Sequence, residues 1–252
     1  MAHGQISITS SGTYTQNFDT LINSGSGTWT DNSTITGWYA QHTGTGSAIA
    51  ASAGTNTGGL YSFGTGTSGD RALGSVGSSG ASAGNYAWGV QFQNSSSGTV
   101  TFGTLSYVGE EWRNSAAAAQ TVTVWYKTSS SLITDFGAGN DTGWTALTAL
   151  NFTSPITGGT AGTLDGNLSA NRVSLSSSIN SITLTSGLFV AFRFSDPDHS
   201  GSDHSLAIDD FSLNYSAAAI PEPATYAAML GVVALTGALI HRRRLQADKR
   251  VA

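Results

Sequence analysis

The chain of 252 residues contains no cysteine. A scaffold held by disulfides and a thiolate-bound zinc or iron–sulfur centre are therefore excluded. Charge is also scarce, because Asp, Glu, Lys and Arg make up only 10% of the residues, against about 25% in an average soluble domain. With only 10 Lys and Arg residues in all, the chain lacks the basic surplus of a nucleic-acid-binding protein, and we expect no nucleic-acid partner.

Small and polar residues take the place of charge. Glycine alone occupies 32 positions, and glycine, serine, threonine and asparagine are all poor helix formers. Aromatic residues make up 10% of the chain and include six tryptophans, whereas disordered chains have few aromatics and a high net charge. The composition therefore predicts a folded, all-β protein with polar loops.

Apolar residues in the range 5–216 alternate with period two in many short stretches, which is typical of strands. In Tyr86–Asn94, for example, every second residue is Tyr, Trp, Val or Phe. We expect one large domain, a two-sheet antiparallel β-sandwich of jelly-roll type, without a helix longer than about two turns. The predicted strands are Thr34–Ala40, Leu60–Phe63, Tyr86–Asn94, Thr99–Val108, Gln120–Lys127, Ala146–Phe152, Ser181–Thr185, Leu188–Ser195 and Ser205–Asn214, with long loops at Thr43–Gly59, Ser75–Gly84 and Gly158–Gly166.

The end of the chain differs from the rest in charge. Residues 1–220 contain 13 acidic and five basic residues, a net charge of −8, whereas 221–252 contain two acidic and five basic residues, a net charge of +3. The uncharged run 224–240 would form a helix of about 25 Å, at the short end of what spans a bilayer. We therefore expect a linker at 217–223, a single transmembrane helix at 224–240 and a basic cytoplasmic tail at 241–252.

This ending also has a family resemblance. The residues Pro221, Glu222 and Pro223, then a short apolar helix, then Arg242, Arg243 and Arg244 resemble the PEP-CTERM sorting signal of exported proteins from Gram-negative bacteria. The resemblance implies recognition by an exosortase, transient anchoring in the inner membrane, and delivery to the cell surface or extracellular matrix. An exported chain needs an N-terminal signal, and we expect residues 1–4, which end in Ala2-His3-Gly4, to be the remnant of one. The alternative is that the protein is never exported.

Two groups of acidic residues are candidate calcium ligands. Asp196, Asp198 and Asp203 are spaced like the front of an EF-hand loop, with Gly201 at the turn but without the closing Glu; an ordinary acidic turn is the alternative. The segment 208–213 is similar to the last strand of jelly-roll carbohydrate-binding and lectin-like domains. That resemblance implies a structural calcium ion, the one cofactor expected here, shared between an early acid and an acid of that strand: Asp19 with Asp209 or Asp210.

Other chemistry-bearing residues have simpler interpretations, which we favour. His199 and His204 could join Asp203 in a zinc or catalytic site, but loop histidines usually face solvent; His42 is the other internal histidine. Glu110 and Glu111 could be a glycosidase pair, but adjacent strand residues point to opposite faces. We expect a structural role instead, in which a buried Arg113 pairs with Glu111. The other possibility is that Arg113 pairs with Asp70 and Arg71. The tryptophans at 29, 38, 88, 112, 125 and 144 form either a core or a sugar-stacking platform.

These observations predict an exported, non-catalytic surface or matrix protein that adheres to exopolysaccharide or gives it structure. The alternative is a carbohydrate-binding module, which would have an exposed aromatic platform or a groove. The third hypothesis is a glycan-active hydrolase, which would present two carboxylates to one another across a cleft.

Overall fold

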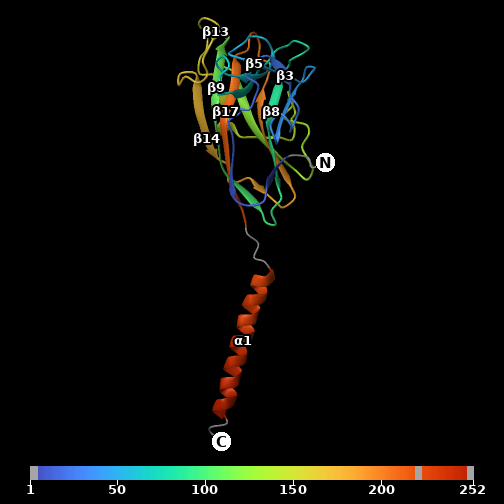
Figure 1. The fold of residues 1–252 in the computed structure, drawn as a ribbon, viewed down its shortest axis with the longest axis vertical. Coiled ribbons are helices and arrows are strands. Elements are labelled where there is room, and N and C mark those ends of the chain that lie inside the picture. Colours follow the sequence, from blue (N-terminus) through green and yellow to red (C-terminus); the bar gives the residue numbers. More distant parts are fainter. Residues whose placement is uncertain (1–4, 219–222, 249–252) are drawn as a thin grey trace. The chain divides into compact units, whose positions relative to one another are not determined.

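The computed structural model describes residues 5–218 and 223–248, and in the second range it describes the side chains of 229–240 and 242. The chain forms two compact units, Met1–Ala218 and Ala219–Ala252. The first unit, called the body below, is a two-sheet β-sandwich (Figure 1). Its only helix within residues 5–218 is the short 3₁₀ turn η1 (Thr148–Leu150), which confirms the predicted all-β class.

One sheet has seven strands: β1 (Ile6–Ile8), β4 (Trp38–His42), β8 (Tyr86–Asn94), β10 (Thr121–Ser129), β11 (Thr145–Ala146), β12 (Phe152–Thr153) and β16 (Phe189–Asp196). The strand order is β1-β8-β16-β10-β11, with β4 beside β8 and β12 beside β10. The centre of the sheet is the antiparallel pair of β8 and β16, which runs from Tyr86 opposite Asp196 to Gln93 opposite Phe189.

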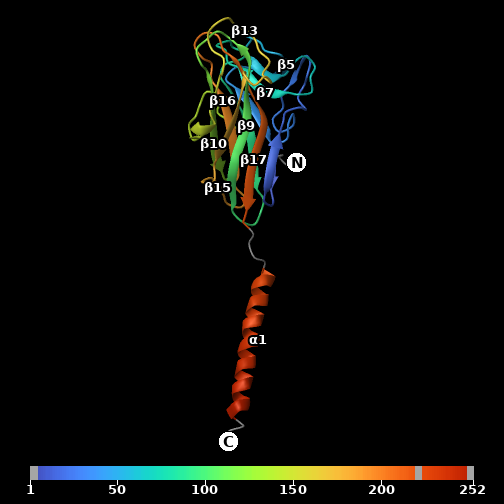
Figure 2. The same ribbon diagram turned by 90° about the vertical axis from the view of Figure 1, so that its left-hand side faces the viewer.

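The other sheet has ten strands: β2 (Gly12–Gln16), β3 (Ser26–Thr28), β5 (Ala48–Ser52), β6 (Gly59–Phe63), β7 (Ala72–Val76), β9 (Val100–Asn114), β13 (Gly162–Thr163), β14 (Arg172–Ser178), β15 (Thr183–Leu184) and β17 (Ser205–Ala217). The order is β13-β9-β17-β7-β6-β5-β3, with β14 and β15 on β9 and β2 on β17. The long strands β9 and β17 lie side by side at its centre (Figure 2).

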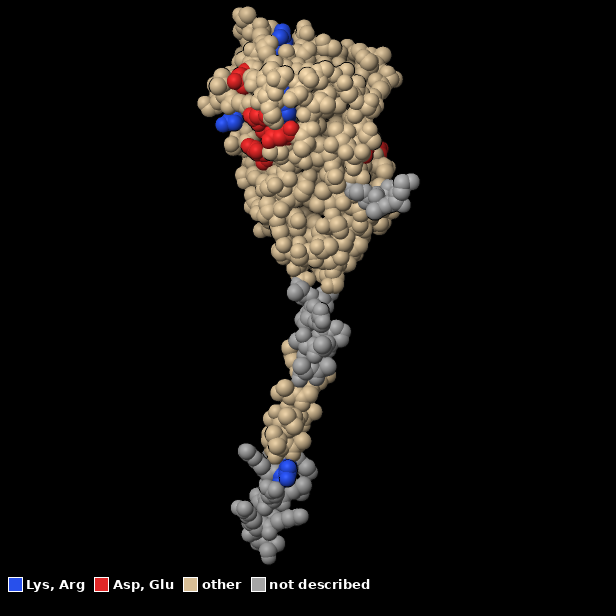
Figure 3. Space-filling model, viewed as in Figure 1, with Lys and Arg blue, Asp and Glu red and all other residues tan. Residues whose placement is uncertain are grey.

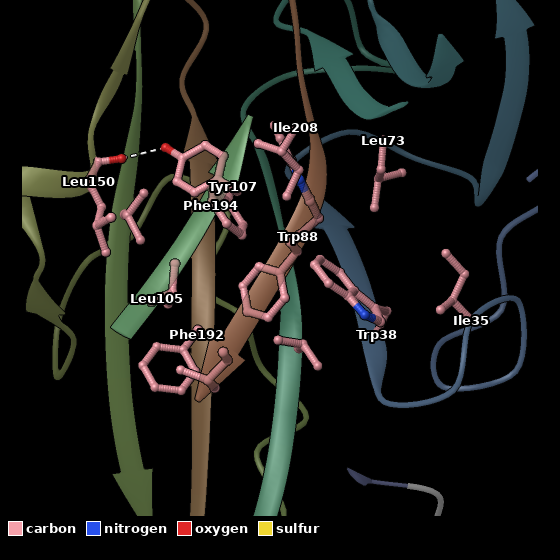
Figure 4. Packing of buried hydrophobic residues seen from close by; sticks show 14 of the residues in the cluster. Ile35, Trp38, Leu73, Trp88, Leu105, Tyr107, Leu150, Phe192, Phe194 and Ile208 are labelled. Atoms are coloured by element: carbon pink, nitrogen blue, oxygen red, sulfur yellow. Dashed lines mark hydrogen bonds between the residues drawn. The ribbon is translucent and has the colours of Figure 1, made fainter. Parts of the chain in front are cut away.

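The core fills the space between the sheets with aromatic and branched side chains. Trp38, Trp88 and Phe192 are fully buried there (Figure 4). The hydroxyl of Tyr107 on β9 donates a hydrogen bond to the carbonyl oxygen of Leu150 in η1, which joins the two sheets (Figure 4). Burying each such side chain stabilises the fold by about 1.5–3 kcal/mol, so the alternating aromatics of the sequence account for most of the driving force.

The structure corrects several predicted elements. Not all neighbours are antiparallel, because β1 pairs with β8 and β5 with β6 in parallel. The connection from β5 to β6 depends on Gly54, which has a φ of +113°. A Cβ atom at this position would lie 2.1 Å from the backbone oxygen of Trp112, so only glycine fits. The predicted loop Thr43–Gly59 therefore contains strand β5. The predicted strand Ala146–Phe152 is instead β11, η1 and β12, since its leucines are spaced by three rather than two.

The second unit contains one helix, α1 (Pro223–Asp248). Its apolar side chains between residues 229 and 240, such as Leu230 and Val233, are exposed. Within the described ranges, no helix has the length and apolar character that crossing a bilayer requires. The expected transmembrane helix at 224–240 is therefore not supported, although its helical conformation is.

Candidate functional site

A cleft of about 720 Å³ opens where the edge of one sheet meets the edge of the other. Strand β4 borders it from the seven-stranded sheet, and β3 and the start of β5 border it from the ten-stranded sheet. It is lined by Thr28, Trp29, Thr30, Asp31, Ala40, Gln41, His42, Gly44, Gly46, Ser47, Ala48, Leu60, Tyr86, Asp135, Gly137, Ala138 and Asn140. Because these residues come from separate segments of chain, no sequence motif marks the site.

The turn after β3 forms one rim of the cleft. The indole nitrogen of Trp29 and the backbone nitrogen of Ala40 both donate to Oδ1 of Asp31, at 2.8 and 2.9 Å. The backbone nitrogen of Trp29 donates to the carbonyl oxygen of Ser47 at 2.6 Å, which joins this rim to the segment before β5. The carboxylate of Asp31 is thereby fixed at the mouth of the cleft.

A stacked pair of rings lies along the cleft. His42 at the end of β4 stacks on Tyr86 of β8, with ring centroids 5.1 Å apart and an interplanar angle of 14°. Nδ1 of His42 lies 2.9 Å from the carbonyl oxygen of Ala83, and Nε2 lies 2.8 Å from that of Gly46. The imidazole therefore links two loops, and a backbone carbonyl faces each of its nitrogens.

The opposite wall is the loop 130–144, which crosses the outer face of the seven-stranded sheet. Gln41 connects β4 to this loop, because its amide donates to the carbonyl oxygen of Thr134 at 2.6 Å and accepts from the nitrogen of Phe136 at 2.8 Å. From β16, Arg193 is fully buried beneath the loop and holds it from below. The wall of the cleft is therefore built on rigid strands.

No tryptophan forms an exposed platform. Five of the six are buried, and the sixth, Trp125, is half-buried under the guanidinium group of Arg193 at 5.5 Å. The tryptophans are core residues, as the simpler interpretation held. The carbohydrate-binding hypothesis predicted either an exposed aromatic platform or a groove. Of these two, the groove is present, and it would recognise a ligand through polar groups.

The adjacent glutamates point to opposite faces of β9, as predicted, but their partners differ from the prediction. Glu111 lies in the interior, where its Oε1 is 3.1 Å from Nδ1 of His204 and its Oε2 accepts from the nitrogen of Ile156 at 2.8 Å. Arg113 is not its partner. His204 is fully buried rather than facing solvent, because the carboxylate of Glu111 compensates for the loss of water. The two glutamates do not face one another across a cleft.

Figure 3 shows an acidic patch on the surface of the body. Glu110 is buried on β9, close enough to Asp70 and Asp210 for their charges to act on it. There it accepts a hydrogen bond from the indole nitrogen of Trp112 at 3.0 Å. Burial raises the pKa of Glu110 to about 7. Burial also raises the pKa of Asp209 to about 8, and the charges of Glu110 and Asp210 add to this rise. Two neighbouring carboxylates therefore share this face, and the charge of Arg172, opposite Glu110 in the strand pairing, offsets them in part.

Asp19, the early acid of the jelly-roll calcium hypothesis, has hydrogen-bond partners of its own. Asp19 accepts from the side-chain nitrogen of Asn17 at 2.5 Å and from the backbone nitrogen of Arg71 at 3.2 Å. Arg71 itself is buried and donates to Ser62 rather than to Asp70. The alternative pairing of Arg113 with Asp70 and Arg71 is likewise absent from the ion pairs of the described residues.

Asp196, Asp198 and Asp203, at the end of β16 and in the loop after it, remain within reach of one another's charge. Asp196 is buried and accepts from the hydroxyl of Ser75, and burial raises the pKa of this carboxyl to about 7 against the effect of that hydrogen bond. Asp203 instead lies 3.3 Å from Nδ1 of the half-exposed His199. Among the residues described, no three His, Asp or Glu side chains are placed to hold a metal ion. Calcium binding by these carboxylates stays a prediction.

The calcium hypothesis makes a thermal prediction. Ions that bind the folded state alone raise its stability by about 2.7 kcal/mol at a hundred times the dissociation constant. The full-length chain should then melt at a higher temperature in millimolar CaCl₂ than in EDTA, and Asp198→Ala should reduce the difference. Equal melting temperatures would leave residues 196–203 as an acidic turn.

The proposed sorting residues are described only in part. Pro221 and Glu222, like residues 1–4 of the expected signal remnant and 249–252 of the expected tail, lie outside the described residues. Pro223 is the first residue of α1, and Arg242 is exposed on it. Arg243 and Arg244 continue the helical backbone.

Comparison with known proteins gives a fold likeness. No protein-family model matches the sequence, and no curated protein matches it. Among solved structures, the chain is similar to the CBM22-1 xylan-binding domain of Xyn10C from Paenibacillus barcinonensis, with 11% identity and a TM-score of 0.37, over 84% of this chain and 99% of that one.

Two further structures show a weaker likeness. TmCBM61, solved with β-1,4-galactotriose, has 10% identity and a TM-score of 0.27 over 60% of this chain and 73% of that one. The glycoside hydrolase domain of Endo-D from Streptococcus pneumoniae R6 has 14% identity and a TM-score of 0.35, over 80% of this chain and 27% of that one. These likenesses are weak, and the functional argument rests on the cleft.

Proposed function

We propose that the body is a carbohydrate-binding module whose ligand lies in the cleft between β3, β4 and the loop 130–144. The observation that carries this proposal is the cleft itself, which is about 720 Å³ in volume and is lined by hydroxyl, amide, carboxylate and aromatic groups. A pocket of that size with convergent polar groups is the usual form of a small-ligand site. Sugar rings suit such a lining, since they offer many hydroxyls and apolar C–H faces.

The design of the walls supports binding. Arg193, Gln41 and Asp31 each fix a wall through hydrogen bonds to the backbone. A preformed site loses little conformational entropy when a ligand binds. The described carboxylates that have raised pKa values lie outside the lining of this cleft; they are Glu110, Asp196, Asp198 and Asp209. The arrangement favours a binding function over hydrolysis.

Filling the cleft tests the proposal. Ala48 is an exposed cleft residue at the start of β5, so Ala48→Trp places a bulky ring where the sugar would lie. We expect the full-length chain to bind oligosaccharides on a glycan array and the variant to bind them at least tenfold more weakly. Ala146→Trp is the matched control, because Ala146 is equally an exposed strand alanine but lies outside the cleft. Unchanged binding by Ala48→Trp would move the site elsewhere.

We also propose that the chain is exported and then sorted at the surface of a Gram-negative cell. The motif Pro221–Pro223 and the arginines Arg242–Arg244 support this proposal, and so do the exposed apolar side chains of 229–240 in α1. A surface location would place a glycan-binding body in contact with exopolysaccharide, either as an adhesin or as a structural component of the matrix. The processing enzyme would be an exosortase.

The sorting proposal predicts a processing defect. Replacing Pro221, Glu222 and Pro223 together with alanine should leave the full-length chain associated with the inner membrane, because the cleavage motif is gone. Fractionation and immunoblotting in the native host would measure this, with Ser216→Ala, just before the motif, as the control. Processing of the motif variant at the parental rate would refute the sorting role.

A further inference from the structure

The charge of the cleft indicates the kind of glycan that it selects. Two carboxylates line it, Asp31 on the β3 side and Asp135 on the loop 130–144, and no Lys or Arg is among the lining residues. Both aspartates are exposed to solvent, so they carry negative charge into the binding space. The cleft is therefore an acidic groove in a body whose residues 1–220 already have a net charge of −8.

Each carboxylate uses one oxygen for structure. Oδ1 of Asp31 accepts from Trp29 and Ala40, and Oδ1 of Asp135 accepts from the backbone nitrogen of Gly137 at 2.7 Å. The second oxygen of each accepts no hydrogen bond from the described part of the chain. Two fixed carboxylates on opposite walls thus keep an acceptor oxygen available to a ligand.

The nearest arginine, Arg193, acts on Asp135 through its charge but forms its ion pair with Asp141. Arg193 directs its guanidinium nitrogens to the carbonyl oxygens of Phe136, Gly137 and Asn140 and to Asp141. Both nitrogens of His42 face carbonyl oxygens of the protein. A ligand with its own positive charge would therefore find the complementary charge in this cleft, and an anionic ligand would be repelled.

We infer that the cleft selects glycans that carry free amines, such as β-1,4-linked glucosamine units without their N-acetyl groups. This inference rests on the carbohydrate-binding function proposed above. An ammonium group donates charge-assisted hydrogen bonds to carboxylates, which are about twice as strong as neutral ones. N-acetylation removes the charge, and a uronic acid reverses it. The neutral hydroxyls of the ring are left to the threonine, serine and backbone groups of the lining.

Isothermal titration of the full-length chain tests the inference with four hexasaccharides: β-1,4-glucosamine, its fully N-acetylated form, xylohexaose and hexagalacturonate. We expect the glucosamine hexamer to bind at least tenfold more tightly than the acetylated one, hexagalacturonate to bind most weakly, and the preference to shrink at high salt. The variant Asp31→Asn/Asp135→Asn keeps the Oδ1 acceptors. It should bind the glucosamine and acetylated hexamers equally well.

A charge-matched control separates the cleft from the general acidity of the body. Asp165→Asn removes a carboxylate that accepts from the nitrogen of Asn167, outside the cleft, and should keep the preference. Loss of the preference in this control, or its survival in the double variant, would overturn the inference. Equal binding of amine-bearing and acetylated hexamers, still blocked by Ala48→Trp, would overturn the inference but leave the proposed function intact. Failure of every oligosaccharide to bind would reject the proposed function itself.

Discussion

The full-length protein should be several kcal/mol more stable at pH 5 than at pH 9. Burial raises the pKa of Glu110 from 4.5 to about 7, of Asp196 from 3.8 to about 7, and of Asp209 from 3.8 to about 8. A raised pKa means that the folded state holds these protons more tightly than the unfolded chain. The contribution of these three carboxyls to the free energy of unfolding is therefore highest below about pH 4 and falls as the pH rises toward 8.

The buried histidine acts in the same direction. Burial by itself would lower the pKa of His204, but the hydrogen bond and charge of Glu111 outweigh it, so the pKa is raised. The stability from this protonated pair is complete below the unfolded histidine value and is lost as the pH passes the folded one. Since a tenfold difference in proton affinity between the folded and unfolded states corresponds to about 1.4 kcal/mol, we expect a total difference on the order of 5 kcal/mol.

Thermal melts at pH 5, 7 and 9 measure this effect, which should reach on the order of 10 °C for a body of this size. The variant Glu110→Gln/Asp209→Asn removes two of the titrating carboxyls while it keeps their shapes. It should flatten the pH dependence and melt above the parent at pH 9. A parent that melts at a higher temperature at pH 9 than at pH 5 would show that these carboxyls are solvated.

Arg193→Met should destabilise the fold by about 3 kcal/mol, in the range for removing one member of a buried charged network. Methionine keeps the aliphatic part of the side chain but removes the planar guanidinium group. That group stacks on Trp144, with its central carbon 4.3 Å from the ring centroid. Nη1 alone donates to three carbonyl oxygens of the loop 130–144, at 2.9, 3.0 and 3.0 Å. Without it these oxygens lose their partner, and the wall of the cleft loosens.

Urea unfolding and hydrogen exchange test this together. Amides between residues 136 and 144 should exchange faster in Arg193→Met, while those of β9 and β17 keep their protection. Arg193→Lys should recover only part of the stability, since an ammonium group does not reproduce the planar guanidinium group. Arg172→Met is the control, because Arg172 is an exposed arginine on β14 and should change stability by less than about 0.5 kcal/mol. A similar small change in Arg193→Met would contradict the role assigned to it.

Segments in which apolar and polar residues alternate strongly could be assigned as strands from the sequence. In these segments the residues that alternate are also the ones that the sandwich buries. The prediction for β8, Tyr86–Asn94, matches the structure residue for residue. The prediction for β6 differs by one residue at its start, and that for β16 by one residue at each end. Strand β5 was missed, since the run Ala48–Ser52 has one large apolar residue and becomes a strand only by pairing with β3 and β6. Strand β14 was missed because it is a largely exposed edge strand with few apolar residues.

The candidate site could not be derived in the same way. Trp29, Asp31, His42 and Asp135 line one cleft although up to about a hundred positions separate them. The sequence instead drew attention to close-set carboxylates, of which Asp196 accepts from Ser75 and Asp203 lies beside His199. Spacing along the chain identifies a site only when the ligands lie on one turn or one helix face.

The sequence by itself determined the class of fold and the division of the chain, because alternation of apolar residues, scarcity of helix formers and the change of charge after residue 220 are all local properties. The tertiary structure alone decided which polar groups meet. It buried His204 against Glu111, placed Arg193 under the wall of the cleft, and brought the edges of two sheets together around Asp31 and Asp135. Those contacts depend on strand order and register, which pair residues far apart in the chain and leave no periodic signal in the sequence.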